Sequence, residues 1–168
     1  MLIRDAMARD AGAIAAIYNQ AVRDTSAIWN DKEVDAADRR AWLNGRQGEG
    51  FPVLVAEDAG NVLGFASYGP WRNFDGYRHT VEHSVYVRDD MHGQGLGAQL
   101  LETLIARARA QKLHVMIAGI EAGNSVSITL HEKLGFVESG RLPQVGAKFG
   151  RWLDLVFMQL TLDDRAEP

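Results

Sequence analysis

Apolar residues recur along the chain with two different periods, and each period predicts a different kind of element. Ile14, Ile17, Tyr18 and Val22 repeat at helical spacing, which predicts an amphipathic helix over residues 9–23. The same spacing predicts three further helices, over residues 35–44, 97–111 and 125–134. Short β-branched and aromatic runs predict strands over residues 2–7, 52–57, 62–68, 80–87, 115–120, 136–140 and 152–162.

Chain length and element order together indicate one α/β domain. At 168 residues the chain is long enough to bury the core of a single domain. The predicted elements follow each other as β-α-α-β-β-β-α-β-α-β-β, with no internal repeat and no linker. We expect the domain to span residues 1–163 and the charged tail, residues 164–168, to fray.

Composition removes several classes of function. The net charge is −4, which disfavours nucleic acid or an anionic membrane as a partner. The chain has no cysteine, so disulfides and thiolate metal sites are excluded. No segment approaches the length of a membrane span, and a cytoplasmic protein is the expectation. No metal site is expected either, because His79 and His83 would lie about 13 Å apart on one strand.

The segment from Ser84 to Leu101 carries the strongest chemical signal. A β-branched strand ends near Val87, Gly93, Gly95 and Gly97 follow, and apolar residues then repeat at helical spacing. A glycine-rich turn that opens a helix directs unpaired backbone N–H groups outward, at the positive end of the helix dipole. Such a turn typically binds phosphate.

Several interpretations of this turn compete. A P-loop is excluded because no lysine follows the glycines. A dinucleotide fingerprint is harder to exclude, since Gly93, Gly95 and Ala98 fit G-x-G-x-x-[G/A], but few strand–helix pairs remain to build that wide fold. A coenzyme A pyrophosphate loop is the third interpretation, and a turn without a ligand is the fourth.

The turn resembles the central motif of the GNAT superfamily of N-acetyltransferases, [RQ]-x-x-G-x-[GA]. Here the motif is His92-Gly93-Gln94-Gly95-Leu96-Gly97, with His92 where Arg or Gln is usual. The resemblance implies a mixed, mostly antiparallel sheet of about seven strands, with helices on both faces and a splayed central strand pair. It also implies that acetyl-CoA contacts Val85, Tyr86, Val87, His92, Gly93, Gln94, Gly95, Leu96, Gly97, Ala98, Asn124 and Lys133.

A second cluster, Asn124-Ser125 followed by Leu134-Gly135-Phe136, also resembles a GNAT signature. In that family the asparagine bonds the pantetheine arm, which lies between the splayed strands. The plain alternative for Asn124 is a helix N-cap, which this residue type favours strongly. For Lys133 the alternatives are a contact with a CoA phosphate and a solvated surface charge.

Residues 80–87 and 145–154 narrow the resemblance to the phosphinothricin and methionine sulfoximine N-acetyltransferase group. This similarity covers nearly the whole chain. It implies transfer of acetyl from acetyl-CoA to the α-amine of a glutamate-like amino acid, of the methionine sulfoximine, phosphinothricin or methionine sulfone class. A homodimer is implied too. The alternatives are an acetyltransferase for another small amine or a protein N-terminus, and a CoA-binding module without activity.

Two residues are candidates for proton transfer. The attacking amine must lose a proton, and Glu82, on the strand before the glycine turn, is the expected general base; the alternative is a carboxylate that only anchors the ammonium group. Backbone N–H groups near Tyr86 and Val87 are the expected oxyanion donors. His131 occupies the position at which many family members carry the tyrosine acid, and an imidazolium could protonate the departing thiolate. A packing or capping histidine is the alternative.

The anionic groups of such a substrate call for cations. Arg72 and Arg78 flank a loop rich in aromatic and basic residues, and Arg binds carboxylates in bidentate fashion. The predicted substrate-binding set is Trp29, Arg72, Asn73, Phe74, Arg78 and Glu82.

Overall fold

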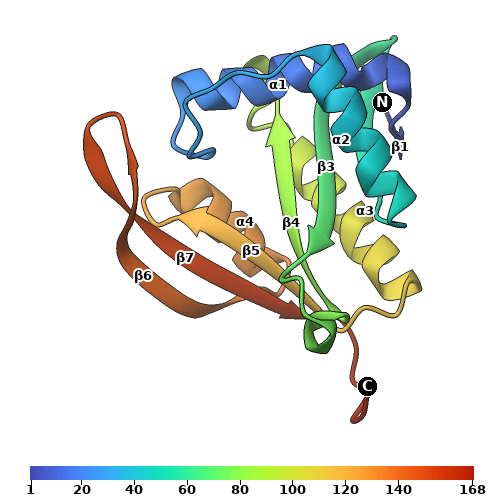
Figure 1. Ribbon diagram of the computed structural model, residues 1–168, viewed down its shortest axis with the longest axis vertical. Helices are drawn as coiled ribbons and strands as arrows, with labels where there is room; N and C mark the ends of the chain where they lie inside the picture. The colour runs from blue at the N-terminus through green and yellow to red at the C-terminus, as the bar shows by residue number, and fades with distance from the viewer.

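The computed structural model describes all residues, 1–168, and contains one seven-stranded sheet (Figure 1). The spatial order is β1-β2-β3-β4-β5-β7-β6, and every neighbouring pair is antiparallel except β4 and β5. This confirms the mixed, mostly antiparallel sheet. The strands are β1 (Leu2–Asp5), β2 (Val53–Asp58), β3 (Asn61–Pro70), β4 (Thr80–Val87), β5 (Val115–Glu121), β6 (Val137–Lys148) and β7 (Arg151–Thr161).

Four α-helices cover the two faces of the sheet, as predicted. They are α1 (Ala11–Asp24), α2 (Ala36–Gly48), α3 (Leu96–Ala110) and α4 (Ser125–Lys133). The first two pack on one face through a core that includes Ile14 and Leu43, and the other two cover the opposite face. Three short 3-10 turns, Ala8–Asp10, Asp75–Tyr77 and Asp89–Met91, complete the chain. None of the helices combines the length and the apolar character needed to cross a membrane.

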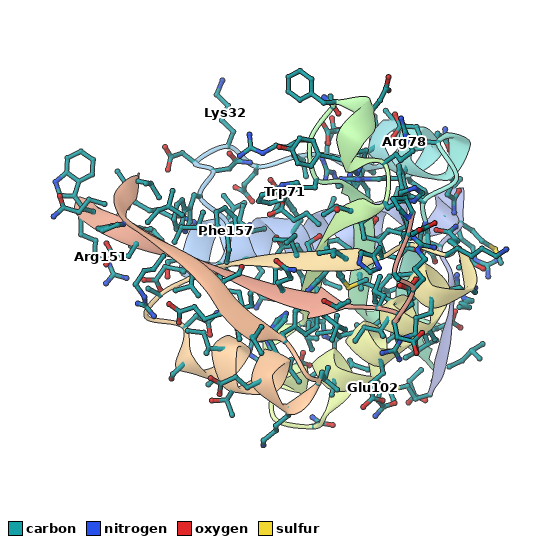
Figure 2. The ribbon with its side chains drawn as sticks, turned by 90° about the horizontal axis from the view of Figure 1, so that it is seen from below. Lys32, Trp71, Arg78, Glu102, Arg151 and Phe157 are labelled. Carbon is teal, nitrogen blue, oxygen red and sulfur yellow. The ribbon has the colours of Figure 1, made fainter.

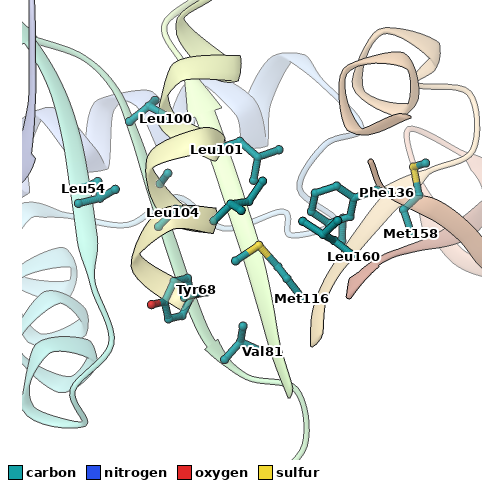
Figure 3. Packing of buried hydrophobic residues seen from close by; sticks show 14 of the residues in the cluster. Leu54, Tyr68, Val81, Leu100, Leu101, Leu104, Met116, Phe136, Met158 and Leu160 are labelled. Carbon is teal, nitrogen blue, oxygen red and sulfur yellow. The ribbon is translucent and has the colours of Figure 1, made fainter. Parts of the chain in front are cut away.

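The larger core fixes the helix that follows the glycine turn. Leu100, Leu101 and Leu104 of α3 are fully buried against Tyr68, Met116 and other residues of the sheet (Figure 3). Burial of each such side chain contributes about 1.5–3 kcal/mol. The position of the N-terminal end of α3 is therefore set by packing along the whole helix.

The central strands β4 and β5 separate soon after they meet. They pair only from Thr80–Val115 to Glu82–Ile117, although β4 continues to Val87 and β5 to Glu121. Beyond Glu82 the facing backbone edges of the two strands have no partner in the sheet. This is the splayed central pair that the GNAT resemblance implied.

Two boundaries differ from the sequence predictions by more than two residues. The helix expected to end at Gly45 continues to Gly48, since neither glycine has a positive φ. The glycine-containing loop expected between residues 140 and 152 is mostly strand, so β6 and β7 form a long hairpin that extends beyond the rest of the sheet (Figure 1). A bulge at Leu142–Gly146 absorbs the irregular sequence, and the Asp154 carboxylate accepts the Gln144 N–H there at 2.8 Å.

Candidate active site

A cleft of about 1660 Å³ lies where β4 and β5 separate. The two strands, the N-terminal ends of α3 and α4, the 24–27 loop and the tip of the β6–β7 hairpin all contribute to its walls. A smaller hollow, of about 730 Å³, lies beside α1. Three of its four arginines, Arg4, Arg23 and Arg88, are each paired with a carboxylate, and Arg9 alone has no such partner.

The glycine turn forms one wall of the cleft. Gly93 and Gly95 have φ values of +76° and +77°, which side-chain-bearing residues rarely adopt. The first helical hydrogen bond of α3 runs from Gln99 N–H to the Gly95 carbonyl, at 3.2 Å. The N–H groups of Leu96, Gly97 and Ala98 therefore have no acceptor in the chain and are available to an anion.

The structure brings the predicted cofactor-contacting residues together. Of the twelve, eleven line the cleft; Gln94 does not, and its amide reaches back toward the Asp90 carbonyl at 3.4 Å. Asn124 is indeed the N-cap of α4, because its Oδ1 accepts the Ser127 N–H at 3.1 Å. Its Nδ2 has no partner in the chain, so capping leaves the amide donor free to bond a ligand.

Glu82 lies in the floor of the cleft, at the last point where β4 and β5 pair. Its Oε1 lies only 3.0 Å from the position that a Cβ on Gly119 would occupy, so the glycine makes room for the carboxylate. Burial raises the pKa of Glu82, and the positive charges of Arg46 and Arg72 oppose that rise. Both effects suit a carboxylate that must ionise and yet remain basic.

His131 is buried and stacks on His83, which belongs to β4. Its Nδ1 donates to the Ser127 carbonyl at 2.7 Å, and its Nε2 lies 3.1 Å from His83 Nε2. Because a carbonyl oxygen only accepts, Nδ1 carries the His131 proton, Nε2 accepts, and His83 donates. Burial lowers the pKa of His131 and lowers that of His83 to about 3. The pair is therefore neutral near pH 7, which disfavours the imidazolium acid expected from the sequence.

The predicted substrate-binding residues are only partly gathered. Glu82 lines the cleft, and Arg72 is exposed beside Trp71 but close enough to Glu82 to lower its pKa. Trp29 packs over Gly146 of β6, with its indole N–H donating to the Ser26 carbonyl at 2.8 Å. Five of the six lie outside the cleft lining, and four of these five, Arg72, Asn73, Phe74 and Arg78, are also exposed, so their role in substrate binding stays a prediction.

Sequence reasoning missed several groups around the cleft. Trp71 stacks edge-to-face on Phe157 of β7, with ring centroids 5.1 Å apart (Figure 2). Phe157 in turn lies 3.8 Å from a Cβ built on Gly119, which places an aromatic wall next to Glu82. Arg46 of α2 also lines the cleft, although nothing in its helical sequence context distinguishes it.

Lys148 is another missed residue, and it holds the loop after α1. Its Nζ is buried and donates to the carbonyls of Val22, Thr25 and Ile28 at 2.6–2.7 Å. The lysine comes from the end of β6, so it fastens the hairpin to the 24–27 wall of the cleft.

Comparison with known proteins decides the family. Residues 14–136 match the model of the acetyltransferase (GNAT) family. This chain belongs to the GNAT family. It is 65% identical to an L-methionine sulfoximine/L-methionine sulfone acetyltransferase of Pseudomonas paraeruginosa, over 96% of this chain and 94% of that protein. It is 43% identical to a phosphinothricin N-acetyltransferase of Alcaligenes faecalis, over 92% and 79%.

A solved acetyltransferase structure with a bound cofactor has the same fold. It is a putative acetyltransferase of Salmonella typhimurium in complex with acetyl-CoA, with a TM-score of 0.98 and 57% identity, covering 100% of this chain and 97% of that one. The family and fold expected from the sequence are thereby confirmed, and the dinucleotide-binding alternative is excluded.

Proposed function

We propose that the protein transfers acetyl from acetyl-CoA to the α-amine of an amino acid of the methionine sulfoximine, methionine sulfone and phosphinothricin class. The observation that supports this most is the cleft itself, which has unpaired amide donors on one wall and a half-buried carboxylate, Glu82, in its floor. The names of the two close relatives support the substrate class.

The residues present fit coenzyme A. The free N–H groups of residues 96–98 match a diphosphate, the unpaired edges of β4 and β5 match an amide-containing arm, and Asn124 Nδ2 is an unused donor. Acetyl-CoA supplies an activated acetyl thioester. We propose that the contacting set is Val85, Tyr86, Val87, His92, Gly93, Gln94, Gly95, Leu96, Gly97, Ala98, Asn124 and Lys133.

Glu82 is the proposed general base. Its carboxylate accepts a proton from the substrate ammonium group, directly or through water, so that the amine nitrogen has a free electron pair. Its raised pKa makes it a better proton acceptor than a solvated glutamate. The unpaired edge of β4 near Tyr86 and Val87 provides donors for the developing oxyanion.

The departing thiolate needs little help, since a thiol of this kind has a pKa of about 8.5. The acid role of His131 stays a prediction, and its hydrogen bonds favour a second role, in which the neutral ring orients His83 and α4. A His131→Gln variant separates the two. Loss of kcat with intact acetyl-CoA binding supports the acid, whereas an unchanged kcat contradicts it.

A thiol-release assay tests the proposed function. The purified protein is given acetyl-CoA with methionine sulfone, methionine sulfoximine, phosphinothricin, unrelated small amines and a peptide with a free N-terminus. Release with the first three alone supports the proposal. Release only with other amines or with the peptide identifies another acetyltransferase, and release with none identifies a binding module.

The hairpin supports a homodimer. Trp152 and Phe149 are 68% and 59% exposed, and Val145 and Leu142 add to the same apolar end of β6–β7. Sedimentation of the wild type as a dimer and of Trp152→Lys as a monomer is the expected result. We also infer a cytoplasmic location, because acetyl-CoA is made and used inside the cell.

A further inference from the structure

One cation of the cleft has no ion-pair partner in the chain. Arg46 lies in the last turn of α2 and is half-buried, and its guanidinium forms no ion pair within 4.0 Å and no hydrogen bond in the chain. Burial lowers the pKa of Arg46, and the nearby charges of Glu49 and Glu82 only partly oppose this effect, so the fold holds a partly desolvated positive charge without a carboxylate in direct contact. Such a group is costly unless it receives an anion.

The absence of a side chain at Gly69 leaves room for this guanidinium. It lies over Gly69 of β3, where a Cβ would come within 1.1 Å of Nη1 and 2.3 Å of Cζ. Gly69 pairs directly with Glu82 across β3 and β4, so the two residues present the same face of the sheet. Arg46 and Glu82 are thus neighbours, close enough for each charge to affect the other's pKa, and yet they do not form a salt bridge.

A cation next to a base, with a gap between them, matches the two charged groups of an amino acid. In a zwitterionic α-amino acid the ammonium and the carboxylate are attached to the same carbon. A guanidinium binds the carboxylate with two parallel N–H donors, and the neighbouring carboxylate then faces the ammonium group.

We propose that Arg46 binds the α-carboxylate of the substrate and thereby presents the α-amine to Glu82. The assignment rests on the proposed function and deepens it, since it explains selection of α-amino acids over simple amines. Arg72, which is exposed and close enough to Glu82 to lower its pKa, is left for the anionic side chain of the substrate.

The test compares methionine sulfone with its carboxamide, which keeps the α-amine and the side chain but lacks the negative charge. For the wild type, kcat/KM is expected to favour the acid by about 100-fold, as when a buried charge pair loses one partner. In Arg46→Gln this preference should fall below about threefold, mainly through a rise in KM for the acid. Arg40→Gln, an exposed arginine on the same helix, is the matched control and should keep the preference.

A second variant leaves the arginine in place. Gly69→Ala forces the guanidinium away from the strand. It should likewise raise KM for the acid and leave KM for the carboxamide almost unchanged. A purely structural arginine would instead slow both substrates equally. Equal slowing, or an acid preference that survives in Arg46→Gln and Gly69→Ala, overturns the assignment even if the wild type is active. If the wild type acetylates neither compound, the proposed function itself fails.

Discussion

Replacing Glu82 with glutamine is the most informative perturbation of the proposed chemistry. The substitution keeps the shape of the side chain and removes only its capacity to accept a proton. A positioned general base contributes typically about 10²–10⁴-fold, so kcat should fall by that factor while acetyl-CoA affinity is kept. The substitution weakens the contact with the ammonium group, but it also removes a negative charge that competes with the substrate carboxylate for Arg46. KM for the amino acid should therefore change only modestly.

The pH profile gives this prediction a second readout. Because Glu82 has a pKa above the usual 4.5, the wild-type kcat/KM should rise with pH through that elevated value and then level. The glutamine variant depends on substrate that is already deprotonated, so its residual rate should rise about tenfold per pH unit through neutrality.

Stability measurements separate chemistry from misfolding. A carboxyl whose pKa is raised by folding destabilises the native state at pH values above that pKa, and the cost disappears as pH falls below its unfolded value. Glu82→Gln should therefore have an equal or higher Tm than the wild type at pH 7. A colorimetric assay of free CoA thiol measures kcat, and calorimetric melting measures Tm. An unchanged kcat, or a variant profile that still levels near the wild-type pKa, would refute the base.

Three further predictions follow from the same contacts. Gly95→Ala forces a φ of +77° on a side-chain-bearing residue, at a cost of about 1–2 kcal/mol. In steady-state kinetics, this variant should have a KM for acetyl-CoA about tenfold higher and an unchanged preference among amino acids. Lys148→Met leaves three carbonyls without their donor, so the free energy of unfolding in urea should fall by at least about 2 kcal/mol. An unaltered unfolding midpoint would contradict a stabilising role for the three Lys148 hydrogen bonds. His83 is neutral in the fold because its pKa is lowered to about 3, so below pH 6.5 the unfolded chain binds more protons than the native state. The free energy of unfolding should therefore fall between pH 6.5 and 3, by up to about 1.4 kcal/mol per pH unit. In urea titrations, His83→Gln should flatten that slope.

Most of the fold and most of the candidate cofactor-binding residues could be predicted from local sequence patterns. The strand, glycine turn and helix from Ser84 to Leu101 are contiguous, and the left-handed conformations of Gly93 and Gly95 need glycine whatever surrounds them. The N-cap alternative for Asn124 is confirmed and was predictable for a similar reason, since a cap is a short-range interaction between Asn124 and Ser127.

The groups that sequence reasoning missed depend on long-range placement. Lys148 and Val22 are 126 residues apart, and His83 and His131 are 48 apart, so no spacing rule connects them. Arg46 is one arginine among several on α2, and only the pairing of Gly69 with Glu82 gives it a distinct position. The continuation of β6 beyond residue 140 was missed because Gly140, Pro143 and Gly146 interrupt its pattern, whereas a bulge accommodates the irregular residues and pairing with β7 resumes after it.

Titration calorimetry with the purified chain tests the central claim most directly, namely that main-chain amides at the start of α3 bind the diphosphate of coenzyme A beside a waiting carboxylate. The account predicts one acetyl-CoA bound per chain, weakened in Gly95→Ala and unchanged in Glu82→Gln. Absence of any heat with acetyl-CoA, or binding that Gly95→Ala leaves unaffected, would contradict it.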